Sequence, residues 1–510
     1  MITFANFASI LQSYITGDDW ERVKDLPISG VVSDSRAVKS GEVFALLSIN
    51  PDTKHQAKNY IDGINPVAVL SEISSNDMGY DDQNLPKMPI VHIANLRLIL
   101  GDFIKAYLHK KQPVSSPKIL AVTGTNGKTT ISQLTAQLGE LSCKPSAIMG
   151  TAGNGRLGHL VQSTHTTSEV IKVHEFLHTM GADGVQMVAL EASSHGLHQH
   201  RLQGVGVSVG VFSNLSRDHL DYHADMDEYG SAKARLFDTS YFKELSHAII
   251  NIDDTFGRQL AQDLQGSNLP DGDLTVWTYS TADSTATFFA DNISPSLHGV
   301  RFELHSPFGV VELNSPLLGR FNVGNLLASV ASLLALYPDD FANLSAIVPK
   351  LHGARGRMQV VGTSKAGAVF IVDYAHTPDA LTQVLTSLKA HTDGKLWAVF
   401  GCGGDRDKGK RPLMAKAGLD LADRVILTSD NPRSENPNAI LNDMQAGMTC
   451  DEHYRTIIEP DRKQAIQYAV QHAKAGDIVV IAGKGHETYQ EINGVRYDFD
   501  DVAVVQELIN

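Results

Sequence analysis

Short apolar runs alternate with longer amphipathic stretches along most of the chain. In the middle of the sequence, these runs predict buried strands near 119–123, 186–190, 207–212 and 247–251. The alternation returns later, with runs at 370–372, 397–400, 425–427 and 478–481. Strands that alternate with helical segments indicate parallel sheets in α/β domains. Polar residues follow most of these strands, and ligands of open α/β sheets bind beyond the carboxyl ends of the strands.

Two stretches have the composition of domain boundaries. Residues 112–117 are rich in Pro and Ser, and a helical stretch gives way to glycine and arginine between 349 and 356. We therefore predict three α/β domains, at 1–112, 113–350 and 351–510. The first has a strand-like run at 43–47 and little catalytic chemistry. The other two carry polar strand ends, which predicts an active site in the cleft between them.

Composition narrows the function classes. The 510 residues carry a formal net charge of −14, which disfavours bulk affinity for nucleic acid or for a membrane surface. No apolar run is long enough to span a bilayer, and residues 1–11 predict an amphipathic helix rather than a signal peptide. The cysteines Cys143, Cys402 and Cys450 are widely spaced, which fits a reducing cytosol and no disulfide framework. We expect Cys402, in a glycine-rich loop, to be a small filler and not a nucleophile.

The most specific chemistry lies between the strand that ends near Val122 and a predicted helix at 131–140. A glycine-rich turn at this point directs backbone N–H groups and the positive helix end toward an anion. Lys128 can reach the outer phosphates of a nucleotide, and the Thr129 hydroxyl can bind Mg²⁺. Because Val122 stands where the common loop has its first glycine, the loop is a shorter variant. It comprises Gly124, Thr125, Asn126, Gly127, Lys128, Thr129 and Thr130.

Three further residues predict metal chemistry, and each has an ordinary alternative. Glu191 ends a buried strand, where a shared Mg²⁺ or a local salt bridge would satisfy its carboxylate. His219 lies in a loop dense in His and Asp, which could hold a second divalent ion or could simply be solvated. Lys233 lies in a helical stretch, and only carbamylation would make it a metal ligand, because an ammonium cannot coordinate a cation.

The last domain carries charged residues after three different strands. Arg406 and Arg433 offer planar groups that suit bidentate binding of a carboxylate, and Glu487 could bind an ammonium group. Each of these residues alone is an ordinary surface charge. Their shared position after strands predicts a receptor for an amino acid.

Together these motifs resemble the Mur ligases, the ATP-dependent amide ligases of peptidoglycan precursor synthesis. The resemblance covers the whole chain. It rests on the loop at 124–130, on Glu191 with residues 193–197, and on residues 218–223, 373–378, 430–433 and 483–487. The Asp430-Asn431-Pro432-Arg433 sequence is similar to that of the members that add diaminopimelate, whereas lysine-adding members vary the arginine. Diaminopimelate differs from lysine by a second carboxylate, which Arg433 could bind.

The resemblance implies a small N-terminal nucleotide-sugar domain, a central P-loop ATPase-like domain and a C-terminal Rossmann-like domain. It implies a cytoplasmic enzyme of cell-wall synthesis that uses ATP, Mg²⁺, UDP-MurNAc-L-Ala-D-Glu and meso-2,6-diaminopimelate, and we expect a monomer. Beyond the phosphate loop, it implies ATP contacts from Asn322, Arg357, Asp373 and His376. It implies that the sugar-dipeptide contacts Ser33, Ser35, His55, Gln56, Ala57, Thr166, Thr167, Ser193, Gln199 and Arg201. The implied diaminopimelate site comprises Arg406, Asp430, Asn431, Pro432, Arg433, Gly483 and Glu487.

The resemblance also implies the catalytic set. Lys128, Glu191, His219 and Lys233 would be catalytic, and Mg²⁺ would bind Thr129, Glu191, His219 and Lys233 as N6-carboxylysine. The chain departs from the family pattern at Ser168, where proline is usual, and at Arg355, and neither change removes an implied ligand. A lysine-adding ligase, a folylpolyglutamate synthetase-like ligase and a nucleotide-binding regulatory protein without catalysis stay as alternatives.

Overall fold

The computed structural model describes residues 1–510 except 48–53, 55, 81–83, 164, 221 and 267–273. The chain divides into two compact units. The first comprises Met1–Ser132, Cys143–Ile250 and Asp254–Val276, and the second comprises Gln133–Ser142, Asn251–Asp253 and Trp277–Asn510.

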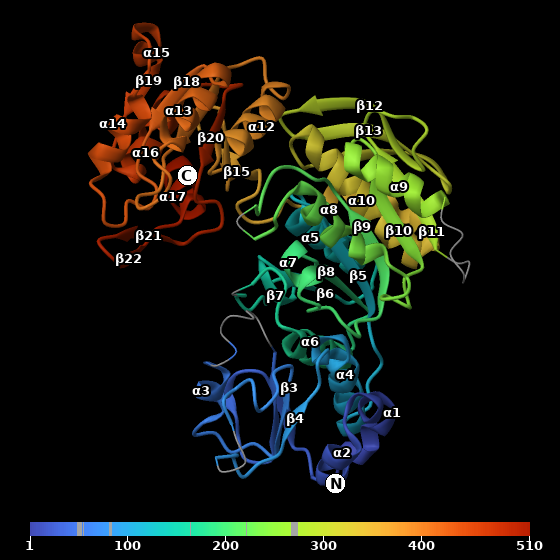
Figure 1. Ribbon diagram of the computed structural model, residues 1–510. Coiled ribbons are helices and arrows are strands. Elements are labelled where there is room, and N and C mark those ends of the chain that lie inside the picture. Colours follow the sequence, from blue (N-terminus) through green and yellow to red (C-terminus); the bar gives the residue numbers. More distant parts are fainter. Residues whose placement is uncertain (48–53, 55, 81–83, 164, 221, 267–273) are drawn as a thin grey trace. The chain divides into compact units, whose positions relative to one another are not determined.

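The chain begins with a small parallel sheet in the order β1-β2-β3-β4 (Figure 1). Its strands are β1 (Gly30–Val32), β2 (Glu42–Leu46), β3 (Ala68–Ser71) and β4 (Ile90–His92). The helices of this region are α1 (Ala8–Leu11), α2 (Gly17–Val23), α3 (Lys58–Ile61) and α4 (Leu100–Lys111). Phe4, Phe7 and Trp20 pack with α4 residues against one face of the sheet, in a core that this region completes largely by itself.

The central part of the first unit has the strand order β10-β9-β5-β8-β6-β7. The strands are β5 (Lys118–Thr123), β6 (Ser146–Gly150), β7 (Gly153–Arg156), β8 (Met187–Glu191), β9 (Val207–Phe212) and β10 (His247–Asn251). The helices are α5 (Lys128–Leu141), α6 (Val170–Ala182), α7 (Ser194–His198), α8 (Met226–Ala234) and α9 (Thr255–Gly266). Strands β5, β8 and β9 are parallel, so their carboxyl ends place the phosphate loop, Glu191 and Ser213 at the same edge of the sheet.

The second unit contains antiparallel strands and a C-terminal α/β sheet. After β11 (Thr275–Ser280), the chain forms three antiparallel strands, β12 (Phe288–Ser296), β13 (Gly299–Ser306) and β14 (Gly309–Ser315). The buried helix α10 (Arg320–Leu336) and the short α11 (Leu344–Ile347) follow them. The C-terminal sheet has the order β15-β16-β20-β17-β18-β19. Its strands are β15 (Gln359–Thr363), β16 (Val369–Asp373), β17 (Leu396–Phe400), β18 (Arg424–Leu427), β19 (Thr456–Ile458) and β20 (Ile478–Ala482).

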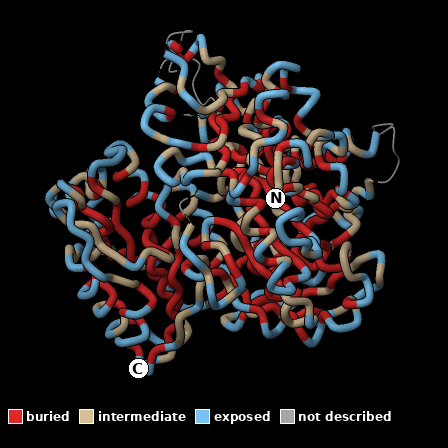
Figure 2. Tube along the Cα trace, turned by 90° about the horizontal axis from the view of Figure 1, so that it is seen from below, coloured by how far each residue is buried: buried red, intermediate tan, exposed pale blue. Residues whose placement is uncertain are grey.

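Helices cover both faces of the C-terminal sheet, as the two separate apolar clusters on its strands require. These helices are α12 (Pro378–Lys389), α13 (Lys410–Leu421), α14 (Pro437–Gln445), α16 (Arg462–His472) and α17 (Asp501–Ile509). The short α15 (Cys450–Arg455) has no buried residue and belongs to neither cluster. A two-stranded hairpin, β21 (Tyr489–Ile492) and β22 (Val495–Asp498), precedes α17. Buried positions are concentrated in the interior, and exposed positions lie on the surrounding loops (Figure 2).

The α/β class and the predicted strands are confirmed, with ends that differ by one or two residues. The predicted helix at 131–140 begins three residues earlier, at Lys128, because the phosphate loop leads directly into the helix. The domain boundaries at 112 and 350 stay predictions. Within the described residues, no helix is both long and apolar enough to cross a membrane.

Candidate active site

The phosphate loop occupies the sharp turn between β5 and α5. Gly124 has φ +143°, and a Cβ at this position would lie 1.9 Å from Ser213 Oγ, so only glycine fits. Lys128 folds over the loop, and its Nζ donates to the carbonyl oxygens of Gly124 at 2.8 Å and Thr125 at 2.9 Å. The loop is therefore held in a cradle shape by its own lysine, with the start of α5 directly behind it.

Residues after β9 brace the loop from the other side, and the sequence did not indicate them. The Asn126 N–H donates to Asn214 Oδ1 at 2.9 Å, and Ser213 Oγ donates to the Asn126 carbonyl at 2.6 Å. These bonds satisfy backbone groups that an isolated loop would expose. The loop conformation is thus fixed by the neighbouring strand as well as by its own glycines.

Glu191, at the end of β8, lies beside the loop and is buried. Its Oε1 accepts from Thr129 Oγ1 at 3.0 Å and from the Thr151 N–H at 2.9 Å, and its Oε2 accepts from Thr151 Oγ1 at 3.2 Å. Burial raises the pKa of this carboxyl, against the lowering effect of Lys128 and of these hydrogen bonds. A carboxylate next to a threonine hydroxyl is a hard-oxygen donor set that fits Mg²⁺.

Lys233, near the end of α8, is buried without a carboxylate partner in the described part of the chain. Its Nζ donates to the Gly124 carbonyl at 2.9 Å and lies 4.2 Å from the centre of the Tyr229 ring. Burial, and secondarily the charge of Lys128, lower the pKa of Lys233 to about 6. The side chain is therefore a neutral amine at physiological pH, which is the form that reacts with CO₂.

His219 lies on the exposed loop before α8. Its backbone has φ +53°, a left-handed conformation that a histidine adopts at some energetic cost. The ring is 5.0 Å from that of His195 and 5.8 Å from that of Tyr229, and Nε2 is 3.6 Å from Asp218 Oδ2. Tyr229, which the sequence did not indicate, also has its hydroxyl 3.2 Å from Thr125 Oγ1. It therefore contacts the phosphate loop, His219 and Lys233.

The residues predicted in this unit for the sugar-dipeptide form one network next to Glu191. Thr167 Oγ1 donates to the Glu191 carbonyl at 2.7 Å and lies 3.0 Å from Ser193 Oγ. Arg201 Nη1 donates to the Thr167 carbonyl at 2.8 Å, and Arg201 also binds Gln199 Oε1. Thr166 Oγ1 is 3.1 Å from Thr151 Oγ1. The structure thus brings together five predicted residues from three segments.

The described residues among the predicted sugar contacts of the first 112 residues lie in a loop or in short 3₁₀ turns. Ser33 is exposed between β1 and the short turn that contains the half-buried Ser35, and Asp34 in that turn pairs with Arg36 at 2.7 Å. Gln56 is exposed and Ala57 is buried immediately before α3. His55 lies outside the described residues. These contacts stay predictions.

The remaining ATP predictions belong to the second unit. Asn322 is buried in α10, and Asp373 accepts hydrogen bonds from the N–H groups of Met358 and Ala375 at 2.7 and 2.8 Å. Arg357 stacks over Tyr374 with its guanidinium 4.8 Å from the ring centre, and His376 is exposed. Asp373 therefore already braces the chain entering the C-terminal sheet, and contact of these residues with ATP stays a prediction.

In the same unit, Arg433 follows β18 in a left-handed conformation with φ +51°. The hairpin holds this conformation, since the Arg433 N–H donates to the Glu491 carbonyl at 3.0 Å and the Asn493 N–H donates to the Arg433 carbonyl at 2.7 Å. Arg433 Nη1 donates to the Gly404 carbonyl at 2.7 Å. In the described part of the chain this is the one hydrogen bond of the guanidinium, so its other donors remain for a ligand.

The other predicted amino-acid contacts surround the same strand ends. Asn431 Nδ2 donates to Glu487 Oε2 at 2.9 Å, and Gly483 follows β20 with φ +115°, with Asp430 Oδ2 3.4 Å from where its Cβ would be. Pro432 is buried, whereas Arg406 is exposed on the loop after β17. Cys402, in that loop, is buried, and burial raises its pKa to about 12, consistent with a filler. The structure thus places Asp430, Asn431, Gly483 and Glu487 in one cluster.

Two protein-family models match the segments that carry the phosphate loop and the amino-acid cluster. Residues 122–333 match the Mur ligase middle domain, and residues 356–485 match the Mur ligase glutamate ligase domain. The chain belongs to the Mur ligase family. A protein of Chromobacterium violaceum named UDP-N-acetylmuramoyl-L-alanyl-D-glutamate--2,6-diaminopimelate ligase is 39% identical over 492 residues, which are 95% of this chain and 94% of that protein.

Solved structures of a diaminopimelate ligase and of a folylpolyglutamate synthase share the fold. A structure named for the same diaminopimelate ligase has a TM-score of 0.76 and 43% identity, covering 100% of this chain and 98% of its own. Folylpolyglutamate synthase of Mycobacterium tuberculosis, solved with ADP and AMPPCP, has a TM-score of 0.58 at 18% identity. That match covers 92% of the synthase but 75% of this Mur ligase, so a quarter of the chain has no counterpart there.

Proposed function

We propose that this chain is the ATP-dependent ligase that joins meso-2,6-diaminopimelate to the D-glutamate γ-carboxylate of UDP-MurNAc-L-Ala-D-Glu. One observation carries the amino-acid assignment. The hairpin holds Arg433 in a left-handed conformation next to the cluster of Asp430, Asn431 and Glu487. Among the described residues the Arg433 guanidinium makes one hydrogen bond, so it keeps donors for a ligand. A carboxylate at the far end of the substrate would bind this fork, and lysine has none. The diaminopimelate ligases that resemble this chain support the same assignment.

The reaction has two steps. The acceptor γ-carboxylate attacks the γ-phosphorus of ATP, which forms an acyl phosphate and releases ADP. The neutral amine of diaminopimelate then attacks the acyl carbon, phosphate leaves with the C–O bond electrons, and the amine loses a proton as the amide forms. Both steps require aligned reactants and exclusion of water.

The residues of the first unit would act mainly by electrostatics. Lys128 would exchange its carbonyl partners in the loop for the phosphate oxygens and stabilise the phosphoryl group in transfer. The network of Thr166, Thr167, Ser193, Gln199 and Arg201, beside Glu191, would position the acceptor carboxylate. When bound by Thr129, Glu191, His219 and carbamylated Lys233, Mg²⁺ would neutralise charge that develops on the phosphate oxygens.

The carbamate follows from the surroundings of Lys233. Its neutral amine attacks CO₂, the new C–N bond forms, and the proton is released to solvent, which leaves an N-linked carboxylate. The nearby Lys128 would favour this anion, as it disfavours the ammonium form. The product would turn a lysine that cannot bind metal into an oxygen ligand.

Phosphate release tests the proposal. The purified chain is supplied with ATP, Mg²⁺ and the sugar-dipeptide, together with diaminopimelate, with lysine or with neither. We expect sustained release with diaminopimelate alone. Release with lysine and not with diaminopimelate would identify a lysine-adding ligase. In a further arm a folate acceptor and glutamate replace the sugar-dipeptide and the two amino acids, and release there alone would identify the synthetase alternative. No turnover in any arm would identify a regulatory protein.

A further inference from the structure

A buried lysine that the proposed chemistry does not use lies beneath the amino-acid cluster. Lys484 follows β20 and is fully buried. Its Nζ is 3.1 Å from Asn431 Oδ1, 3.4 Å from Glu487 Oε2 and 3.7 Å from Asp430 Oδ1, and the Tyr489 ring lies 5.6 Å away. One cation therefore faces two carboxylates and the amide between them.

The two carboxylates are incompletely satisfied within the protein. Asp430 Oδ1 is buried and has no hydrogen-bond partner among the described residues, and its contact with Lys484 Nζ at 3.7 Å is an ion pair too long for a hydrogen bond. Glu487 uses Oε2 for both Asn431 and Lys484, and its side chain is 21% exposed. A buried carboxylate oxygen without a donor is unfavourable unless a ligand or water supplies one. The donors missing here are those that an ammonium group carries.

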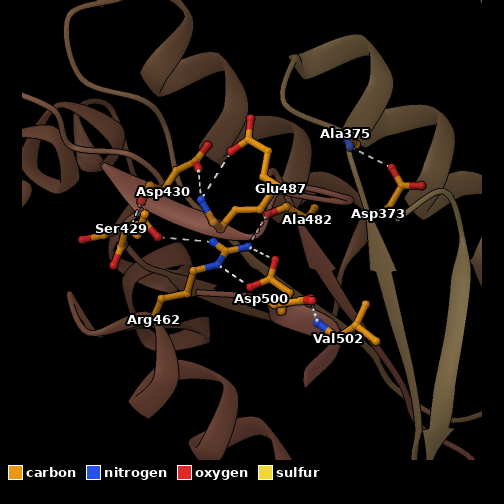
Figure 3. A network of polar contacts seen from close by, with 12 residues as sticks. Asp373, Ala375, Ser429, Asp430, Arg462, Ala482, Glu487, Asp500 and Val502 are labelled. Atoms are coloured by element: carbon orange, nitrogen blue, oxygen red, sulfur yellow. Dashed lines mark hydrogen bonds and ion pairs between the residues drawn. The ribbon is translucent and has the colours of Figure 1, made fainter. Parts of the chain in front are cut away.

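A second buried cation in the same region provides the contrast (Figure 3). Arg462 lies below the strand ends, and its Nε and Nη2 bind both oxygens of Asp501 at 2.8 and 2.7 Å. Its guanidinium also donates to the carbonyls of Ser429 at 3.3 Å and Ala482 at 2.9 Å. Arg462 is thus balanced by one carboxylate and bonded to main chain, as a framework residue is. Lys484 instead contacts side chains of the site and faces two carboxylates, those of Asp430 and Glu487.

We propose that Lys484 is a positioning and charge-balancing residue that tunes the amino-acid site for one ammonium group. With Lys484, the charges of Asp430 and Glu487 sum to one net negative charge. This charge matches the ammonium at the far end of the substrate, while Arg433 matches the carboxylate there. Lys484 also holds Asn431, whose Oδ1 accepts from the Glu491 N–H at 2.9 Å and so connects the cluster to the hairpin. The inference rests on the proposed function, because it identifies the ligand as an amino acid.

Steady-state kinetics of Lys484→Met test the inference, with ATP and the sugar-dipeptide saturating. Without Lys484 the two carboxylates repel each other and Asn431 Oδ1 loses a partner, so the geometry of the site changes and the KM for diaminopimelate should rise about tenfold or more. The KM for ATP should change less than about twofold, because the side-chain partners of Lys484 are Asn431, Glu487 and Asp430, which belong to the predicted amino-acid site. Lys463→Met is the matched control, since that lysine is exposed on α16 and pairs with Glu507 at 2.9 Å.

A second substitution separates charge balance from mere packing. Asp430→Asn alone removes the net negative charge and should raise the KM for diaminopimelate. The double variant Lys484→Met/Asp430→Asn restores one net negative charge and should have a KM below that of either single variant. A KM for diaminopimelate that is unchanged in Lys484→Met, or a double variant worse than both singles, would overturn the inference. If Lys484→Met does not fold, an unchanged KM in Asp430→Asn overturns it.

The wild-type enzyme keeps this test distinct from the proposed function. If the wild type turns over lysine and not diaminopimelate, the proposed substrate is wrong, and the same variants are then assayed with lysine, whose far end also carries an ammonium group. If the wild type turns over diaminopimelate and the variants do not behave as stated, the inference alone fails.

Discussion

Lys233 beside the phosphate loop and Lys484 beneath the amino-acid cluster are both buried lysines, and they differ in the charges around them. Lys233 faces a carbonyl, an aromatic ring and a second lysine, and burial lowers its pKa to about 6. Lys484 faces two carboxylates within 3.7 Å. Without an ion-pair partner, the buried amine of Lys233 favours its neutral, nucleophilic form, which suits the proposed carbamate. Beside two carboxylates, the amine of Lys484 instead suits the proposed charge balance of the amino-acid site.

The largest expected effect comes from removing the side chain of Lys233. Lys233→Ala should lower turnover by at least about a hundredfold, because in the proposed mechanism it deletes a ligand for the Mg²⁺ that would neutralise charge. Added short-chain carboxylic acids should partly restore phosphate release by occupying the space of the carbamate. Exposed Lys243→Ala serves as the control and should keep full activity. Full activity of the Lys233 variant would exclude the carbamate.

Arg433→Met should act on the other region and change specificity. Loss of the fork should lower kcat/KM for diaminopimelate about a hundredfold, with a far smaller change for lysine, which has no second carboxylate to lose. Arg496→Ala, on β22 with its side chain 64% exposed, is the matched control. Parallel losses for both amino acids would mean that Arg433 only supports the loop.

Arg462→Met tests whether Arg462, whose charge is paired with Asp501, stabilises the fold and takes no part in the site. It leaves Asp501 buried and unpaired, so the free energy of unfolding should fall by about 3–5 kcal/mol. The KM for diaminopimelate of the protein that remains folded should change little. Chemical denaturation with kinetics at low temperature measures both quantities. A stable variant with a raised KM would place Arg462 in the site instead.

The protonation of Lys233 predicts a pH dependence in CO₂-free buffer. Its pKa of about 6 in the folded protein lies below the usual 10.5, so between these values the unfolded chain binds more protons at this position. The contribution to stability therefore rises with pH above about 6, by at most about 1.4 kcal/mol per pH unit. Comparing wild type with Lys233→Met at pH 6 and pH 9 isolates it. A pH-independent difference would contradict the lowered pKa.

The smallest effect is expected at Cys402. It is buried in the glycine-rich loop after β17 and its pKa is raised, so it is a filler without chemistry. Cys402→Ala should change kcat/KM for diaminopimelate by less than about twofold. Inactivation on this substitution, with unchanged thermal stability, would show that the thiol takes part.

The sequence was most informative where one local signal decides the structure. The strands β5, β8 and β9 are continuous apolar runs, and the loop at 124–130 has a recognisable glycine pattern. The hairpins β6–β7 and β12–β14 were missed. Small and glycine positions obscure β6 and β7, whereas the alternation of Val300, Phe302 and Leu304 with polar residues in β13 is a strand signal that the prediction overlooked.

The supporting residues were also missed, for a physical reason. Thr151 and Tyr229 contact the site through tertiary pairing that no sequence spacing reveals, whereas Ser213 follows a predicted strand and only its contact with Asn126 could not be foreseen. Lys484 lies inside a motif that was recognised, yet its role depends on Asp430, which is 54 residues away and follows β18, a strand separated from β20 by β17. Residue types predict which chemistry is available, and tertiary pairing determines which groups balance one another.

A competition assay tests the central claim most directly. The enzyme, ATP, Mg²⁺ and the sugar-dipeptide are mixed with equal concentrations of meso-diaminopimelate and lysine, and the products are separated and identified by mass. We expect the product carrying diaminopimelate to exceed the lysine product by about a hundredfold, because Arg433 is proposed to bind the second carboxylate. Equal amounts, or an excess of the lysine product, would contradict it.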